Sequence, residues 1–257
     1  MNKRLEDWIN WILIDELKSG IINAPKHLLG NHDYGDGQVI MVYRPHAEKV
    51  CVVSPTGKNR DEMECLSDGV YGFYCAKKKY KGTKYRIETT YQDGTTVVTA
   101  DAYAFDSQIT DFDTYLFAEG KHYDVYEKFG AHPMTIDGVK GTYFAVWAPH
   151  ARRVSVVGDF NMWDGALNPM QMMQTSGIYE LFIPDVAPGA VYKYQILTRD
   201  GEILYKADPY GNQSQVRPDN ANVVADLTGY KWKDIGWIDN RKKQTRETEL
   251  KKPMAIY

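Results

Sequence analysis

The chain has 257 residues, of which 43% are apolar and 25% are charged, a composition that supports a packed core and excludes global disorder. Its length suits two domains of about 150 residues, and it lacks the apolar run of roughly 18 residues that a membrane span needs. The net charge of −3 argues against nucleic acid as the main partner, and three cysteines without metal-ligand spacing predict free thiols in a reducing cytoplasm.

The first predicted element is a helix within residues 1–20, because apolar side chains recur there at helical spacing and Gly20 can end it. The apolar residues are Leu5, Trp8, Ile9, Ile12, Leu13 and Leu17. We expect this helix to pack on the domain that follows. A helix on a membrane surface is disfavoured, because Asp7, Asp15 and Glu16 make its polar face acidic.

The rest of the chain repeats itself once. The offset between equivalent residues is 100 at the first motif (132 − 32) and 108 further on (177 − 69). The matched runs are Leu29-Gly30-Asn31-His32 with Phe129-Gly130-Ala131-His132, and Tyr43-Arg44-Pro45-His46 with Trp147-Ala148-Pro149-His150. Later, Tyr85, Asp101 and Tyr103 return as Tyr192, Asp208 and Tyr210. Two long copies indicate a duplicated domain rather than a solenoid of short repeats.

Each copy is predicted to be a β-sandwich. Short runs rich in Val, Tyr, Phe and Ile, separated by Asp-Gly and Pro-Gly turns, are typical of strands. They lie at 38–44, 49–53, 70–76, 84–90 and 95–99, and again at 142–147, 153–157, 178–183, 191–198 and 202–205. The expected fold class is all-β, with two tandem immunoglobulin-like sandwiches and a short N-terminal helix. A (β/α)8 barrel is excluded, because helical segments between the strands are missing.

These elements divide the chain into five segments. After the helix at 1–20 come the first sandwich at 21–110, a linker at 111–125 and the second sandwich at 126–232. Residues 233–257 begin as a charged linker, which lacks the interleaved aromatic residues of a nucleic-acid patch. The run Pro253-Met254-Ala255-Ile256-Tyr257 then opens a new strand. Because a strand needs a pairing partner, we expect a further domain after it.

The sequence carries no known catalytic motif. It has no G-x-S-x-G elbow, no Gly-rich phosphate loop and no H-E-x-x-H, so we predict no catalytic residue, no metal site and no cofactor. Four of the six histidines lie at equivalent places in the two copies, which favours a shared turn geometry over a metal site. They are His32, His46, His132 and His150.

Two groups of residues have ordinary structural interpretations. The acidic pairs Asp159 with Asp164 and Asp111 with Asp113 lie in predicted loops, where hydrogen bonding within turns is the simplest role. Several aromatic residues are expected in the core rather than at a binding surface. These are Trp147, Tyr143, Tyr179, Tyr194 and Tyr210.

The two copies differ most clearly in one loop. The second copy has Gly158-Asp159-Phe160-Asn161-Met162-Trp163-Asp164-Gly165, and the first has Asn59 opposite Trp163. An exposed indole offers a flat apolar face and one N–H donor, which suit the C–H faces and rim hydroxyls of a sugar. Lys193, on a predicted strand, could donate to hydroxyls. Two structural alternatives stay open: Trp163 as an anchor of its own loop, and Lys193 as part of a solvated face.

Several runs resemble the 1,4-α-glucan (glycogen) branching enzymes. Tyr126-Glu127-Lys128-Phe129-Gly130-Ala131-His132-Pro133, residues 141–149 and the loop around Trp163 resemble their family-48 carbohydrate-binding module, a β-sandwich. Tyr205-Lys206-Ala207-Asp208-Pro209-Tyr210 also matches, and residues 253–257 resemble the opening of the family's catalytic barrel. His27-Leu28-Leu29-Gly30-Asn31-His32 resembles the extra N-terminal domain of many bacterial members.

The resemblance implies the non-catalytic N-terminal part of a cytoplasmic, bacterial branching enzyme of glycogen biosynthesis. It implies α-1,4-glucan or glycogen as a partner, next to the enzyme's own catalytic barrel, and neither nucleic acid nor membrane. The implied glucan-binding residues are Trp163, Lys193, Asn222, Asn161 and Asp164. Ile203 stands where a related kinase-subunit module has a second Trp, so we expect one stacking residue. The alternative is a structural or interaction module that binds no sugar.

Overall fold

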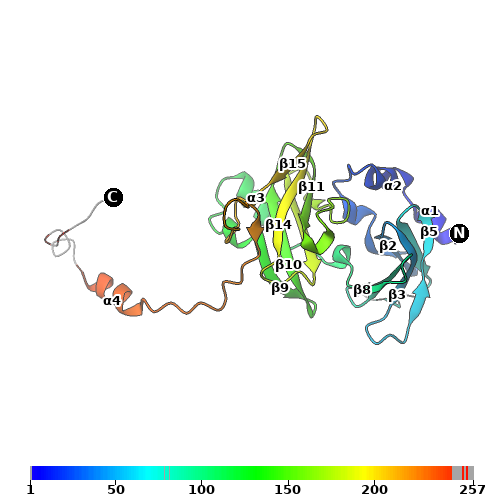
Figure 1. Cartoon of the computed structure of the whole chain (residues 1–257), viewed down its shortest axis with the longest axis horizontal. Helices are drawn as coiled ribbons and strands as arrows, with labels where there is room; N and C mark the ends of the chain where they lie inside the picture. Colours follow the sequence, from blue (N-terminus) through cyan, green and yellow to red (C-terminus); the bar gives the residue numbers. More distant parts are fainter. Residues whose placement is uncertain (1, 78, 81, 245–250, 252, 254–257) are drawn as a thin grey trace. The chain divides into compact units, whose positions relative to one another are not determined.

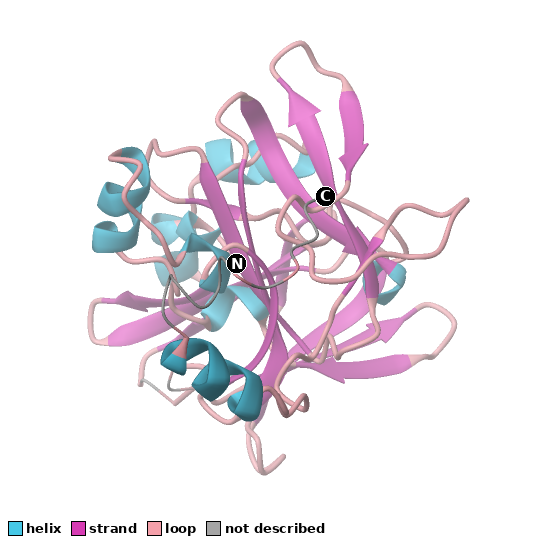
Figure 2. Cartoon of the chain, turned by 90° about the vertical axis from the view of Figure 1, so that its left-hand side faces the viewer, coloured by secondary structure: helices cyan, strands magenta, loops and turns pink. Residues whose placement is uncertain are grey.

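The structure is a computed structural model that describes residues 2–77, 79–80, 82–244, 251 and 253. It confirms the all-β fold class, because the described residues form four four-stranded antiparallel sheets and only short helices (Figures 1 and 2). Residues 1–225 form one compact unit, and residues 226–257 form another. The three cysteines carry free thiols.

The first copy contains two of the sheets. One has the order β1 (Gly30–Tyr34), β2 (Gly37–Tyr43), β6 (Val70–Cys75) and β5 (Glu64–Ser67). The other has the order β4 (Arg60–Glu62), β3 (Ala47–Val53), β7 (Arg86–Tyr91) and β8 (Thr96–Thr99). Ile40, Val52 and Ile87 belong to the core cluster of this copy and are completely buried.

The second copy repeats this arrangement. One sheet has the order β12 (Gln171–Met172), β13 (Ile178–Pro184), β10 (Val139–Trp147) and β9 (Gly130–Ile136). In the other, β14 (Val191–Thr198) lies beside β11 (Ala151–Gly158) and pairs on its far side with β15 (Ile203–Lys206) and β16 (Asn222–Val223). Equivalent strands follow the same order in both copies, so the two sandwiches share one topology.

All ten predicted strands are present, and their ends lie within three residues of the predicted ones. The sequence did not predict six others: β1, β4, β5, β9, β12 and β16. Most of these are short or polar, and β9 contains Pro133, which an edge strand tolerates. Such strands lack the runs of Val, Tyr, Phe and Ile on which the prediction depends.

Equivalent hydrogen bonds stabilise both sandwiches. Tyr85 Oη donates to Asp101 Oδ2 at 2.6 Å, and Tyr192 Oη donates to Asp208 Oδ2 at 2.7 Å. His32 Nε2 and the equivalent nitrogen of His132 lie 3.2 and 2.9 Å from the carbonyl oxygen three residues earlier. The retained histidines at these two places therefore serve a local turn, as the repeat predicts.

The N-terminal segment forms two helices rather than the one predicted, α1 (Lys3–Trp8) and α2 (Trp11–Lys18). Asn10 causes the break, because its side-chain oxygen accepts from the backbone N–H groups of Ile12 and Leu13 and so starts a new helix. Gly20 ends the second helix with φ +66°. Leu5 and Leu17 are buried against the first sandwich, as expected.

The segment predicted as a linker contains a helix, α3 (Asp111–Ala118). The prediction of a loop at Asp111 and Asp113 was therefore wrong. Thr110 Oγ1 accepts from the backbone N–H of Asp113 at 3.1 Å, and Asp113 Oδ2 accepts from that of Thr110 at 2.8 Å. This capping box begins the helix, and the acidic residues favour its N-terminus. Single turns of 3₁₀ helix occur at Pro25–His27, Ala102–Ala104, Val125–Glu127 and Asp159–Asn161.

Trp147 does not lie in the core. It ends β10 and is 49% exposed, while its indole Nε1 donates to Ser176 O at 3.2 Å and its ring contacts Phe117 of α3. The repeat did not reveal that Trp147 is exposed, because Trp147 lies at the end of a strand. The core predictions for three tyrosines are confirmed, since Tyr143, Tyr179 and Tyr194 are buried; Tyr210 is half-buried.

The C-terminal unit contains one helix among its described residues, α4 (Ile235–Lys243). Arg241 lies over the ring of Trp237 at 5.3 Å. The strand predicted from Pro253 onward falls on residues 254–257, which lie outside the described residues. No helix in the described part of the chain is long and apolar enough to cross a membrane.

A buried carboxylate joins the two sandwiches. Glu180 of β13 is 1% exposed and accepts from Tyr143 Oη at 2.6 Å and from the backbone N–H of Gln108 at 3.1 Å. Lys26, from the first copy, places Nζ 3.7 Å from Glu180 Oε1 and donates to Phe105 O at 2.9 Å. Burial lowers the pKa of Lys26, against the opposing effect of Glu180.

Candidate functional site

The loop at residues 158–165 is called the platform loop below. The side chain of Asn161 anchors this loop through hydrogen bonds. This side chain is 5% exposed, and its Nδ2 donates to Val156 O at 2.9 Å and to Asn168 Oδ1 at 2.8 Å. Its Oδ1 accepts from the backbone N–H of Gly158 at 3.0 Å. Asn161 therefore fixes the loop on the end of β11, and a direct contact between Asn161 and glucan stays a prediction.

Two consecutive residues at the tip of the platform loop have left-handed backbones. Met162 has φ +55° and Trp163 has φ +61°. A positive φ is uncommon for a residue with a large side chain and costs about 1–2 kcal/mol per residue. Trp163 is partly exposed, and its indole Nε1 donates to Asp159 Oδ1 at 2.8 Å. The loop thus holds the indole in one fixed orientation.

Lys193 lies on the outer face of the sheet formed by β11, β14 and β15. Its neighbours Tyr192 and Tyr194 are buried in the core, and side chains alternate along a strand, so Lys193 and Gln195 point outward. The platform loop rests on the same face, because a Cβ added to Gly165 would lie 2.0 Å from Gln195 Oε1. Trp163 and Lys193 are therefore brought to one side of the sandwich.

The sequence missed Asn220. This exposed residue accepts a hydrogen bond from Lys193 Nζ, and only the pairing of β16 with β14 brings the two together. Asn222, which the resemblance singled out, is 5% exposed and accepts from the backbone N–H of Asp208 at 2.6 Å. Its amide is thus engaged inside the sandwich, and its contact with glucan stays a prediction.

The acidic pair of the platform loop forms turn hydrogen bonds. Asp159 accepts from Trp163, and Asp164 Oδ1 accepts from the backbone N–H of Ala166 at 2.8 Å. This agrees with the structural interpretation of the pair. Asp164 is exposed, so its carboxylate can still meet a ligand.

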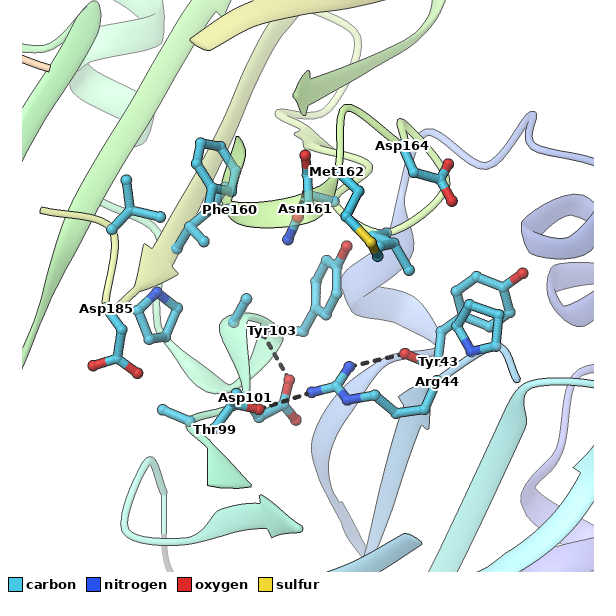
Figure 3. Close-up of a pocket in the computed structure, with 18 of the residues that line it drawn as sticks. Tyr43, Arg44, Thr99, Asp101, Tyr103, Phe160, Asn161, Met162, Asp164 and Asp185 are labelled. Atoms are coloured by element: carbon cyan, nitrogen blue, oxygen red, sulfur yellow. Dashed lines mark hydrogen bonds between the residues drawn. The ribbon is translucent and has the colours of Figure 1, made fainter. Parts of the chain in front are cut away.

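A cavity of about 540 Å³ lies between the two sandwiches and is called the cleft below (Figure 3). The first copy contributes the end of β2 and the turn after it, with Tyr43, Arg44 and His46, and the segment around Asp101. The second contributes the platform loop and the end of β13. Further residues that line the cleft include Tyr91, Thr99, Tyr103, Phe160, Met162, Asp164, Asn168 and Asp185. Nothing in the sequence pattern indicated this cavity, because distant segments form it.

The polar groups at the base of the cleft are fixed by hydrogen bonds. Arg44 Nη1 donates to Tyr43 O at 2.8 Å and Nη2 donates to Thr99 Oγ1 at 3.3 Å, as Figure 3 shows. Asp101 is 3% exposed and accepts from Tyr85 Oη and from the backbone N–H of Tyr103. Burial raises the pKa of the Asp101 carboxyl, although the bond from Tyr85 opposes this.

Comparison with known proteins matches both sandwiches. Residues 128–211 match the family described as "Carbohydrate-binding module 48 (Isoamylase N-terminal domain)", and residues 10–103 match "alpha-1,4-glucan branching enzyme GlgB, N-terminal domain". The chain is 43% identical over 232 residues to the 1,4-alpha-glucan branching enzyme GlgB of Synechocystis sp., and 42% identical over 239 residues to that of Trichodesmium erythraeum. These alignments cover 90% and 91% of this chain but 29% and 30% of the relatives, so the chain spans less than a third of their length.

Among solved structures, a pullulanase from Anoxybacillus sp. LM18-11 is similar over 79% of this chain and 28% of its own, at 19% identity and a TM-score of 0.34. A TM-score this low does not establish a shared fold.

Proposed function

The chain belongs to the family of 1,4-alpha-glucan branching enzymes, of which it corresponds to the N-terminal region, and from this premise we propose that its second sandwich binds α-1,4-glucan through Trp163 and Lys193. In the full-length enzyme, a catalytic barrel outside these residues forms the α-1,6 branch. This region then holds the glucan beside the barrel, during glycogen biosynthesis in the cytoplasm.

The main support for the proposal is the backbone conformation of the platform loop. Met162 and Trp163 both keep positive φ angles, although neither is glycine. Such strain is retained where the surrounding structure enforces it, and it clusters at ligand sites. Here it fixes an indole on the face that also carries Lys193. A ring face beside a cationic donor is what a sugar with C–H faces and rim hydroxyls requires.

The polar contacts divide into two kinds under this proposal. Lys193, Asn220 and Asp164 are partly or fully exposed and meet the sugar hydroxyls. Asn161 and Asn222 are buried and act by positioning, the first under the platform loop and the second beneath β14.

The first sandwich has a different task. Asn59 stands opposite Trp163 in the repeat, so this copy offers no indole at that place. Arg86 occupies the position of Lys193, and each lies opposite the last valine of the neighbouring strand. We assign the first sandwich to spacing and orienting the second.

Isothermal titration with maltoheptaose tests the site. We expect saturable binding by the 257-residue chain and about tenfold weaker binding by Trp163→Ala or Lys193→Met, each of which loses roughly one stacking or hydrogen-bonding contact. Trp237→Ala is the matched control, since that indole is 63% exposed and lies outside residues 1–225. Equal affinity in Trp163→Ala and the parent chain would refute the assignment.

The same titration separates the proposal from its rival. A structural module without sugar binding would give no heat with maltoheptaose, yet would associate with the separately expressed remainder of the enzyme. We also expect no branching by this chain alone. A shift of the iodine stain of amylose on incubation with the chain would overturn that expectation.

A further inference from the structure

We propose that the cleft between the two sandwiches is a second saccharide site, which takes the uncharged end of an α-1,4-glucan chain. The inference rests on the proposed function for the identity of the polymer. The cleft shares Asp164 with the first site, but Trp163, Lys193 and Asn220 do not line it. Its volume of about 540 Å³ falls within the range of ligand pockets, roughly 300–1,000 Å³, and such pockets favour the junctions of domains.

The walls of the cleft combine ring faces with fixed polar groups. Tyr43, Tyr91, Tyr103 and Phe160 supply aromatic surface, and Met162 points into the space from the platform loop (Figure 3). Arg44 has five N–H donors and spends one from each of two nitrogens on Tyr43 and Thr99. Donors therefore remain for a ligand, and they are already held in place.

The charged side chains that line the cleft favour an uncharged ligand over an anionic one. Among the described residues, three carboxyl groups, those of Asp101, Asp164 and Asp185, and one guanidinium group, that of Arg44, line the cleft, and no lysine does. Even when Asp101 is protonated, two carboxylates outnumber one guanidinium. A phosphate or nucleotide would meet net repulsion here, whereas a neutral polyhydroxyl compound can donate to the carboxylates and accept from Arg44.

The sequence repeat provides an internal comparison. In the second sandwich, Asp208 accepts from two tyrosine hydroxyls, Tyr192 and Tyr194, as well as from a backbone N–H. In the first, Ile87 stands at the place of Tyr194, so Asp101 accepts from one tyrosine hydroxyl and one backbone N–H. Asp101 lines the cleft, and its carboxylate accepts one hydrogen bond fewer than that of Asp208.

The same comparison singles out Arg44. Its equivalent in the second sandwich is Ala148, although the following Pro-His pair is retained. The shared turn therefore does not need arginine. The guanidinium is present in the copy whose turn lines the cleft, and its contacts to Tyr43 and Thr99 keep it at the base.

The platform loop links the two sites. Met162 lines the cleft, and the next residue, Trp163, lies on the loop that rests on the outer sheet face. A glucan that stacks on Trp163 can thus continue past Met162, so that its end enters the cleft.

The experiment is amide chemical-shift mapping of the full chain during titration with maltotriose. The amides of His46, Thr99 and Asp185 report on the cleft, and those of Lys193 and Asn220 report on the Trp163 site. We expect saturable shifts at the cleft in the parent chain and in Trp163→Ala. Arg44→Met should weaken the cleft response about tenfold, the effect of losing one or two hydrogen bonds.

Two further variants keep the test interpretable. Arg86→Met is the matched control, because Arg86 also donates through Nη1 to the carbonyl of the preceding tyrosine but does not line the cleft. It should leave the cleft response unchanged. Asp185→Gly removes an exposed lining carboxylate at φ +64°, which glycine adopts without strain, and should weaken binding in a folded protein.

The possible outcomes separate the two proposals. Shifts at Lys193 and Asn220 with a silent cleft would overturn the second site and leave the proposed function intact. Shifts at the cleft alone would support the second site and count against Trp163. A stronger cleft response to glucose 1-phosphate than to maltotriose would overturn the assignment to a neutral saccharide.

Discussion

Removing the positive charge that faces Glu180 should destabilise the junction of the sandwiches. In Lys26→Met, the buried Glu180 carboxylate loses its counter-ion, and Phe105 O loses a donor. At 3.7 Å and an effective dielectric constant of about 20, the attraction amounts to about 4 kcal/mol. The desolvation of Lys26, which lowers its pKa, offsets part of this. We therefore expect a loss of about 3 kcal/mol, in the range for one-sided removal of a buried pair.

Urea unfolding followed by far-ultraviolet circular dichroism measures the effect. A loss of about 3 kcal/mol shifts the midpoint by roughly 1–3 M for ordinary slopes. The double variant Lys26→Met/Glu180→Gln should recover to within about 1 kcal/mol of the parent, because glutamine carries no charge and still accepts from Tyr143. Lys121→Met, which breaks the exposed pair with Glu119, should leave the midpoint almost unchanged.

Two results would refute this reasoning. A midpoint of Lys26→Met equal to that of the parent would show that the pair adds nothing to the junction. A double variant as unstable as Lys26→Met alone would show that the loss comes from the packing of the lysine stem rather than from an unpaired charge.

Other predictions concern the cap of α3 and the platform loop. Burial alone would raise the pKa of Asp113, but hydrogen bonds from Thr110 and His122 bring it down to about 2. Because the folded pKa lies below the unfolded one of 3.8, Asp113 stabilises the fold above pH 4, and this stabilisation is lost as the pH falls through 2. The Asp113→Asn variant should not show this loss in acid unfolding. Gly165→Ala, whose Cβ would lie 2.0 Å from Gln195 Oε1, should lower the unfolding midpoint and weaken maltoheptaose binding, whereas Gly229→Ala, with open space around it, should do neither. Met162→Gly should raise the free energy of unfolding by about 1 kcal/mol, since glycine adopts φ +55° without strain; an unchanged or lowered value in urea would argue against stored strain.

Local patterns predicted the greater part of the fold, and contacts between distant segments account for the rest. The continuous apolar run of β2, the aromatic and aliphatic residues of β14 and the Asp-Gly turns each involve a few neighbouring residues, so those strands were predicted with nearly correct ends. The break at Asn10 depends on one side chain that competes for backbone N–H groups, which apolar spacing does not register. Trp163 and Lys193 were singled out as candidates, because each stands out in its own run.

Other parts of the site have no local signal. Asn220 reaches Lys193 only through the pairing of β16 with β14. The cleft joins Arg44 to Met162, which lie more than a hundred residues apart in the chain. Resemblance to a family singled out Asn222, but its burial follows from the packing of the whole sandwich.

The platform loop and its counterpart in the first copy differ by a change at the surface of a shared scaffold. In the first copy, Cys51 pairs with Glu62, and in the second the equivalent Ser155 pairs with Pro169, so the connecting segment is three residues longer there (169 − 155 = 14 against 62 − 51 = 11). The shorter segment returns directly as β4. The longer one has room for the left-handed bend at Met162 and Trp163. An Asn59→Trp substitution in the first copy would therefore add an indole without the loop that orients it, and we expect it to leave glucan affinity unchanged.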